Sequence, residues 1–236
     1  MQSLSNKTAL ITGGTKGIGY GMAEALLKEG MKVLITGRTE EGVKEAVQKL
    51  NSENADGIAA DVRKMEDMET AVKRITDNWG QLDVVIANAG VGHFGSIEDL
   101  SSEKWNETID INLTGVFNTI KASIEGLKNS SGYIITVASL AGTNFFAGGS
   151  AYNASKFGLV GFTQAIMLDL RKYGIKTTTI MPGSVSTYFN DHTPNDADAW
   201  KIQPEDLGQM TVDLLKMNPR TLPSKVEVRP TVPPSK

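Results

Sequence analysis

The chain has 236 residues, 40% of them hydrophobic and 22% charged, which suits one globular α/β domain. Its net charge of −3 argues against a nucleic acid partner, and the absence of cysteine excludes disulfides and thiolate chemistry. No apolar run approaches the roughly 18 residues of a membrane span, and the first residues contain no signal-type apolar segment. We therefore expect a cytoplasmic protein with no membrane or nucleic acid partner.

Short β-rich runs alternate with helical patterns along the chain. The strands are expected at Thr8–Thr12, Lys32–Thr36, Gly57–Ala60, Val84–Ala87, Gly132–Val137, Lys176–Met181 and Lys225–Val228. The helices are expected at Gly17–Glu29, Glu41–Leu50, Met65–Asn78, roughly Ser102–Lys128, Tyr152–Lys172 and Pro204–Met217. This alternation predicts an α/β fold, with a doubly wound parallel sheet of about seven strands and helices on both faces. No linker divides residues 1–236, and residues 230–236 are expected to form a proline-rich tail.

A glycine-rich loop connects the first expected strand to the first expected helix. Residues 12–19 read TGGTKGIG, and such glycines let backbone N–H groups approach a pyrophosphate at the positive end of a helix. An ordinary tight turn has a similar composition, but the position directly after the first strand favours a dinucleotide site. The contacts expected from this loop are Gly13, Thr15, Lys16, Gly17, Ile18 and Gly19.

Two further strand ends fit the same ligand. Asp61 and Val62 follow the third expected strand, where the carboxylate can accept a hydrogen bond from an adenine amino group. Asn88, Ala89 and Gly90 follow the fourth, beside the point where such sheets bind ligands. Each segment alone is typical of an ordinary turn, so the prediction depends on their order and location.

The end of the second expected strand indicates which nucleotide is bound. It carries no carboxylate for a ribose diol, but it carries Arg38, and Lys16 lies in the glycine-rich loop. Two cations with the hydroxyls of Thr15 and Thr39 suit a 2′-phosphate, although both cations could also be ordinary surface residues. The sequence therefore predicts NADP(H) as the cofactor.

Four polar residues form a candidate catalytic group. Tyr152 and Lys156 are four residues apart on one face of a helix, Ser139 follows the fifth expected strand, and Asn112 lies on the helix before that strand. A tyrosine and a lysine at this spacing are common by chance, but here they accompany a cofactor loop. His93 and His192 lack the spacing of metal ligands, so we expect no metal site.

Together these motifs resemble the short-chain dehydrogenase/reductase family from Thr8 to about Pro230, with Ala87 replacing a second asparagine common in the family. The resemblance implies a single-domain Rossmann fold in which Lys156 also grips the nicotinamide ribose and Asn112 supports a water chain. It adds Pro182, Gly183, Val185 and Thr187 as cofactor contacts. It also implies a homo-oligomer, a dimer or tetramer, paired through the helices before and after the fifth strand. The second of these helices is apolar around most of its girth.

The expected chemistry is hydride transfer between the nicotinamide and a carbonyl or alcohol. Tyr152 would act as general acid or base, with its pKa lowered by the Lys156 ammonium and the oxidised nicotinamide. Ser139 would hold the substrate oxygen. A non-catalytic NADP-binding regulatory module is a remote alternative, because such proteins would be expected to lose one of these residues.

The substrate is expected to be a small or medium free carbonyl or alcohol. The segment from Ser184 to Gln203 should form a lid, and its net negative charge would repel an acidic carrier protein. The end of the chain is also more similar to sepiapterin reductases than to 3-oxoacyl reductases. A 3-oxoacyl-[acyl-carrier-protein] reductase is the alternative. The expected pocket walls are Phe94, Phe145 and Tyr188, each of which could equally be a packing residue.

Overall fold

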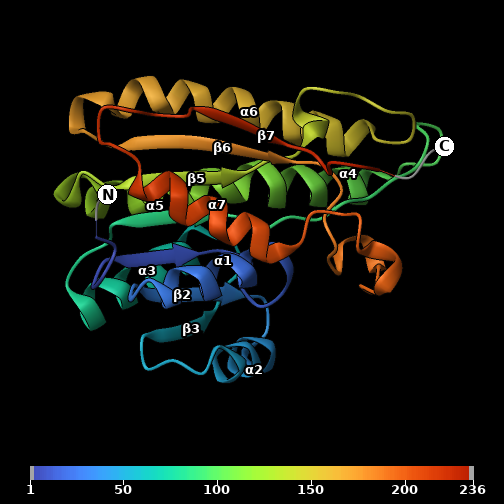
Figure 1. Cartoon of the computed structure of the whole chain (residues 1–236). Coiled ribbons are helices and arrows are strands. Elements are labelled where there is room, and N and C mark those ends of the chain that lie inside the picture. Colours follow the sequence, from blue (N-terminus) through green and yellow to red (C-terminus); the bar gives the residue numbers. More distant parts are fainter. Residues whose placement is uncertain (1–2, 234–236) are drawn as a thin grey trace.

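The computed structural model describes residues 3–233, and in it seven parallel strands form one sheet in the order β3-β2-β1-β4-β5-β6-β7. Figure 1 shows the sheet and the helices that connect its strands. The strands are β1 (Thr8–Ile11), β2 (Lys32–Gly37), β3 (Ala55–Ala59), β4 (Val84–Ala87), β5 (Tyr133–Val137), β6 (Lys176–Pro182) and β7 (Lys225–Val228). The predicted fold class is confirmed.

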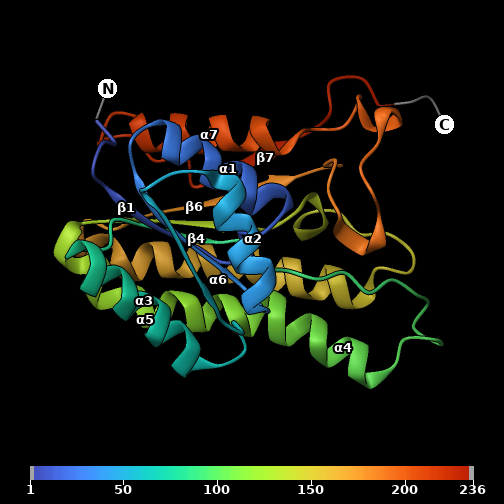
Figure 2. The ribbon, with the colours of Figure 1, turned by 90° about the horizontal axis from the view of Figure 1, so that it is seen from below.

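Helices cover both faces of the sheet, as Figure 2 shows. The helices are α1 (Gly17–Lys28), α2 (Glu40–Leu50), α3 (Met65–Trp79), α4 (Ser102–Ile109), α5 (Gly115–Ser130), α6 (Ser150–Leu170) and α7 (Pro204–Lys216). α1 packs against α7 on one face, and α3 packs against α5 on the other. None of the described helices has the length and apolar character needed to cross a bilayer.

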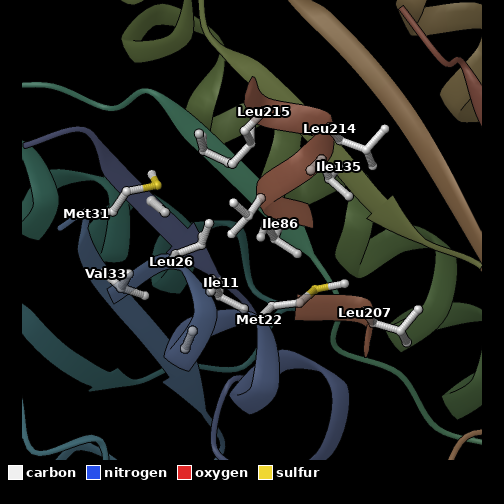
Figure 3. Close-up of a cluster of buried hydrophobic side chains, with 14 of the residues drawn as sticks. Ile11, Met22, Leu26, Met31, Val33, Ile86, Ile135, Leu207, Leu214 and Leu215 are labelled. Atoms are coloured by element: carbon white, nitrogen blue, oxygen red, sulfur yellow. The ribbon is translucent and has the colours of Figure 1, made fainter. Parts of the chain in front are cut away.

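The strands send alternate side chains into two separate cores, because successive residues of a strand point to opposite faces. Ile11 joins the core under α1 and α7, whereas its neighbour Leu10 joins the core under α3, α5 and α6. Figure 3 shows the first core, where Ile11, Ile86 and Ile135 of the sheet meet side chains of both helices. Burial on both faces explains the near-continuous apolar runs of the central strands.

The long helix expected from about Ser102 to Lys128 is interrupted. α4 ends at Ile109, a π-helical turn spans Asp110–Thr114, and α5 begins at Gly115. Residues 102–130 are thus helical as predicted, but the sequence did not indicate the π-helical turn within them. Asn112 lies inside the π-turn and its side chain bonds to other segments, which is typical of such turns at functional sites.

Other differences are confined to the ends of elements. β3 runs from Ala55 to Ala59 where residues 57–60 were predicted, and α6 begins at Ser150, two residues before the predicted start. Residues 230–233 of the predicted tail follow β7 without helix or strand, and residues 234–236 lie outside the described part of the chain.

Candidate functional site

A cavity of about 740 Å³ opens where the carboxyl ends of β1, β2, β4, β5 and β6 meet. Ligands bind at this edge in open parallel sheets, beside the point where the strand order reverses. Here β1 lies between β2 and β4, so the reversal falls at the glycine-rich loop. The predicted site residues in its wall are Gly13, Thr15, Lys16, Gly17, Ile18, Arg38, Asp61, Val62, Asn88, Ala89, Gly90, Ser139, Tyr152, Lys156, Pro182, Gly183, Val185, Thr187 and Tyr188.

The floor of the cavity is formed by backbone at the ends of β1 and β4. Gly13 has a φ of 65°, and a Cβ added there would lie 2.9 Å from Ala89 Cα. Asn88 Nδ2 donates to the carbonyl oxygens of Thr12 and Gly13, both at 3.0 Å. The Asn88 and Ala89 amides donate to Thr12 Oγ1 in turn. These bonds hold the two loops close together and leave a smooth cradle for a pyrophosphate.

Gly19 and Thr39 lie beside the cavity and are absent from its wall. Gly19 is buried under Asn88, since an added Cβ would lie 2.5 Å from Asn88 Nδ2. Thr39 caps α2 by accepting a hydrogen bond from the Gly42 amide at 3.2 Å. Both positions shape the loops that carry other site residues.

The adenosine end of the cavity carries charged and polar groups. Lys16 and Arg38 both line it, and Lys16 Nζ lies 5.5 Å from the centre of the Tyr188 ring. Thr36 Oγ1 is buried at this wall and has no hydrogen-bond partner among the described residues. Such an orphaned polar atom fits a site that is completed by a polar ligand. The cradle and this atom together fit a nicotinamide dinucleotide.

The Asp61 carboxylate accepts hydrogen bonds from the side chain of Arg63. Both of its carboxylate oxygens accept from Arg63 Nε at 2.9 Å. This hydrogen bonding holds the pKa of the Asp61 carboxyl below its usual value. A carboxylate has further lone pairs, so one oxygen can still accept from an adenine amino group.

Ser139, Tyr152 and Lys156 meet at the other end of the cavity. Lys156 Nζ is buried, donates to the Val137 carbonyl oxygen at 3.0 Å, and lies 5.7 Å from the centre of the Tyr152 ring. Burial lowers the pKa of Lys156 to about 8. Burial also raises the pKa of the Tyr152 hydroxyl, and a hydrogen bond with Ser139 opposes that rise. The expected lowering of the tyrosine pKa therefore depends on nearby positive charge.

Asn112 is buried behind these residues and does not line the cavity. Its Oδ1 accepts from the Val91 amide at 2.8 Å, and its Nδ2 donates to the Val91 carbonyl at 2.9 Å and to Ser155 Oγ at 3.0 Å. The side chain thus ties the π-turn to the loop after β4 and to α6. Asn112 also lies close to Gly90, since a Cβ added at Gly90 would be 3.3 Å from Asn112 Oδ1.

The predicted pocket walls are placed differently from one another. Tyr188 lines the cavity beside Lys16, and the Phe94 ring packs edge-on against Tyr152 with centres 5.4 Å apart. The Phe145 side chain is 87% exposed and lies outside the cavity wall. Phe146, the next residue, packs against Phe94 instead.

The sequence analysis missed Phe189 and the charge cluster of the lid. Phe189 lines the cavity with its ring 5.7 Å from that of Tyr152. Asp198 is buried and binds Lys201 Nζ at 2.5 Å as well as His192 Nε2. The pairing holds the pKa of the Asp198 carboxyl well below its usual value. The acidic rim inferred from the lid sequence is therefore weaker than expected.

Backbone contacts join the two ends of the lid segment. Val185 and Ile202 form an isolated parallel bridge, with the Ile202 amide donating to the Ser184 carbonyl at 3.1 Å. No group of three or more histidine or acidic side chains is arranged for a metal among residues 3–233. Ser139, Tyr152 and Lys156 lie in the same cavity as the glycine-rich loop.

A family model described as short chain dehydrogenase matches residues 7–198 of the chain. The chain belongs to the short-chain dehydrogenase family. It is accordingly an oxidoreductase of alcohol and carbonyl groups that uses a nicotinamide cofactor, and the predicted family membership is confirmed.

Among its relatives, this short-chain dehydrogenase is 34% identical over 215 residues to a putative ketoacyl reductase of Streptomyces coelicolor, covering 87% of this chain and 81% of the relative. A solved alcohol dehydrogenase of Thermococcus sibiricus, complexed with 5-hydroxy-NADP, superposes with a TM-score of 0.90 at 27% identity, covering 98% and 99% of the two chains. A 3-ketoacyl-(acyl-carrier-protein) reductase of Brucella melitensis, complexed with NADH, gives 0.89 at 26% identity and 97% and 99% coverage.

Proposed function

We propose that the chain is an NADP(H)-dependent reductase of small or medium free carbonyl compounds, with Tyr152 as the general acid. The observation that carries the proposal is the meeting of Ser139, Tyr152 and Lys156 in one cavity with the glycine-rich cradle. The cofactor supplies or accepts the hydride. Side chains of this chain bind the carbonyl oxygen and transfer the proton.

In the reducing direction the carbonyl oxygen lies between Ser139 and Tyr152. The Ser139 hydroxyl donates a hydrogen bond to that oxygen, and Tyr152 gives it the phenolic proton as the carbonyl carbon receives the hydride. The resulting phenolate is stabilised by the Lys156 ammonium, whose Nζ lies 5.7 Å from the ring centre. In the oxidising direction the phenolate removes the alcohol proton.

The decisive experiment compares the wild-type protein with Tyr152→Phe. We expect the wild type to oxidise NADPH with at least one carbonyl of a broad panel. The variant keeps the ring but loses the proton donor, so kcat should fall by at least ~100-fold while NADPH still binds. Near-normal turnover of Tyr152→Phe would refute the assignment. NADPH binding without turnover of any carbonyl by the wild type would favour a regulatory module.

The preference for NADP(H) over NAD(H) is supported by Arg38 and Lys16 at the adenosine end. Losing a charge-assisted phosphate contact costs about 1.5–3 kcal/mol. We therefore expect Arg38→Asp to lower kcat/KM for NADPH by roughly tenfold to a hundredfold and to leave that for NADH much less affected. Equal kcat/KM values for the two cofactors in the wild type would contradict the preference.

Reduction of a carrier-bound 3-oxoacyl group is the second candidate. It is favoured by the names of the Streptomyces coelicolor and Brucella melitensis proteins. The lid still exposes Asp191 and Asp196, which disfavour an acidic carrier. A higher kcat/KM for a carrier-bound 3-oxoacyl thioester than for free carbonyls at low salt would select this candidate.

The outer face of α5 and α6 supports a homo-oligomer, a dimer or tetramer. Phe117, Phe157 and Leu168 are exposed there, and the Phe117 ring packs edge-on against Phe162 with centres 6.3 Å apart. Exposed apolar side chains that gather on one face mark a contact surface. Light scattering at micromolar concentration should give a multiple of the chain mass, and a monomer mass would refute the assembly. A cytoplasmic location stays a prediction from the sequence.

A further inference from the structure

The phenylalanines of the chain are distributed unusually. There are seven, and none belongs to the buried core of residues 3–233. Phe117 and Phe157 are exposed on the outer face of α5 and α6, and Phe162, which contacts Phe117, also packs against the core beneath these helices. Phe145 is exposed outside the cavity wall, and the remaining group, Phe94, Phe146 and Phe189, lies toward the substrate end of the cavity. Phenyl rings left partly in water do not stabilise the fold fully, so this second group indicates a binding surface.

Three of these rings form an aromatic wall beside the proton donor, in which Phe189 lines the cavity while Phe94 and Phe146 lie outside its lining. Phe94 and Phe189 contact the Tyr152 ring, with centres 5.4 and 5.7 Å apart. Phe94 also contacts Phe146 and Phe189, with centres 5.8 and 6.4 Å apart. Each of the three remains more than a third exposed, so part of every ring is open to a ligand. The group next to a reacting carbonyl would therefore meet apolar ring surfaces.

The position of Phe189 is determined by its neighbours. A Cβ added at Gly92 would lie 2.5 Å from Phe189 Cζ, so the glycine makes room for the ring. Asn190 and Asp191, which follow it, both adopt left-handed backbone conformations with φ of 56° and 58°. Asparagine and aspartate adopt this conformation more readily than other non-glycine residues, so the sequence suits the turn that follows Phe189. Phe189 is therefore seated against the loop after β4, beside Tyr152.

Three side chains at this end that can carry a positive charge are each paired with a carboxylate. Lys201 and His192 line the cavity, but both bind the buried carboxylate of Asp198. His93 Nε2 likewise lies 2.7 Å from Glu107 Oε2. Cations that are already paired offer little to an anionic substrate, and the pairing leaves the aromatic wall as the main recognition surface.

We propose that the substrate presents an apolar, ring-sized group near its carbonyl, and that Phe189 is the residue that selects this group. The inference rests on the proposed function, because it takes Tyr152 as the proton donor. Phe94 packs against Phe189 and Tyr152, and Phe146 packs against Phe94, so these two rings hold Phe189 in position. Phe189 is a specificity residue here and takes no part in the proton transfer.

The test uses three methyl ketones whose carbonyls have similar reactivity: 4-phenyl-2-butanone, 4-hydroxy-2-butanone and the anion 4-oxopentanoate. For the wild type we expect kcat/KM with NADPH to be at least roughly tenfold higher for the phenyl ketone than for either polar ketone. In Phe189→Ala that ratio should fall to about threefold or less while NADPH affinity is unchanged. Phe189→Leu retains apolar bulk and should keep most of the preference. Phe145→Ala removes a ring outside the cavity wall and should keep all of it.

The outcomes separate the inference from the proposed function. Turnover of the hydroxy or carboxylate ketone at a kcat/KM equal to or above that of the phenyl ketone overturns the inference and leaves the reductase intact. An equal loss for all three ketones in Phe189→Ala and Phe189→Leu overturns the selecting role and makes Phe189 a structural residue of the lid. NADPH binding without turnover of these or any other carbonyl overturns the proposed function, and the inference with it.

Discussion

The floor and the lid of the cavity are built in different ways. The floor consists of strand ends and tight loops, where Asn88 bonds to backbone carbonyls of the neighbouring loop and Gly13 leaves room for a ligand. The lid, from Ser184 to Ile202, has one backbone bridge at its base and is otherwise organised by the Asp198 carboxylate. The floor is therefore specified by backbone groups at the ends of neighbouring strands, which the Asn88 side chain joins. The lid is specified by side-chain contacts between residues several positions apart.

The largest effect is expected from breaking the floor. Asn88→Ala removes two hydrogen bonds to buried carbonyls, which should lower the free energy of unfolding by about 2–3 kcal/mol. For a chain of this length the Tm should fall by roughly 5–10 °C, and the NADPH Kd should rise at least ~10-fold. Thermal denaturation and fluorescence titration measure the two quantities. Asn106→Ala, an exposed change on α4, is the matched control. A Kd within twofold of the wild type would show that Asn88 does not shape the cradle.

The pH dependence of activity tests the role of Lys156, which lies at the substrate end of the cavity. Burial lowers its pKa to about 8, so above that pH it loses the charge that stabilises the phenolate of Tyr152. We expect kcat/KM for carbonyl reduction to fall by roughly tenfold per pH unit above pH 8. A flat profile from pH 7 to 10 would contradict this.

The lowered pKa of Lys156 affects the stability of the fold in the opposite direction to its effect on activity. The unfolded lysine has a pKa of 10.5, so between pH 8 and 10.5 the unfolded state binds more protons and this group favours folding increasingly as the pH rises. If activity falls above pH 8 while the Tm does not fall in parallel, the loss comes from titration of Lys156 and not from unfolding. A Tm recorded at each pH is the control.

The smallest effect is expected from loosening the lid. Asp198→Asn removes the charge that binds Lys201 and His192 but keeps the shape of the side chain. We expect KM for the carbonyl substrate to rise by roughly threefold to tenfold with little change in kcat, because the lid is less often in its closed position. Asp196→Asn makes the same charge change at an exposed position of the same turn. If the two variants behave alike, Asp198 is not what organises the lid.

The sequence predicts the floor well because its residues act through local geometry. Glycines after the first strand, Asn88 after the fourth and Arg38 after the second follow directly from strand ends, and the structure brings all of them to one cavity. The register of β3 was less predictable. Asp56 has a low strand propensity, but the Arg74 guanidinium of α3 binds its carboxylate at 2.7 Å, a contact that only the folded chain makes.

The lid and the π-turn could not be predicted from the local sequence pattern. No periodicity in residues 184–202 indicates that Asp198 pairs with His192, or that Phe189 rather than Tyr188 contacts the Tyr152 ring. The π-turn depends on bonds from Asn112 to Val91 and Ser155, which are 21 and 43 residues away. Contacts at such separations leave no mark in a window of one helix.

The π-turn also sets how α5 is rotated about its axis relative to α4. A residue added to or removed from an α-helix rotates everything beyond it by about 100°. Shortening Asp110–Thr114 by one residue would therefore turn α5 relative to α4, so that Asn112 could bond to Val91 only if Phe117 left the outer face. The bond between Asn112 and the loop after β4 and the proposed subunit contact therefore both depend on the length of this one turn. Length changes here are expected to be tolerated far less than in the exposed loops, and Ile111 of the turn also lines the cavity.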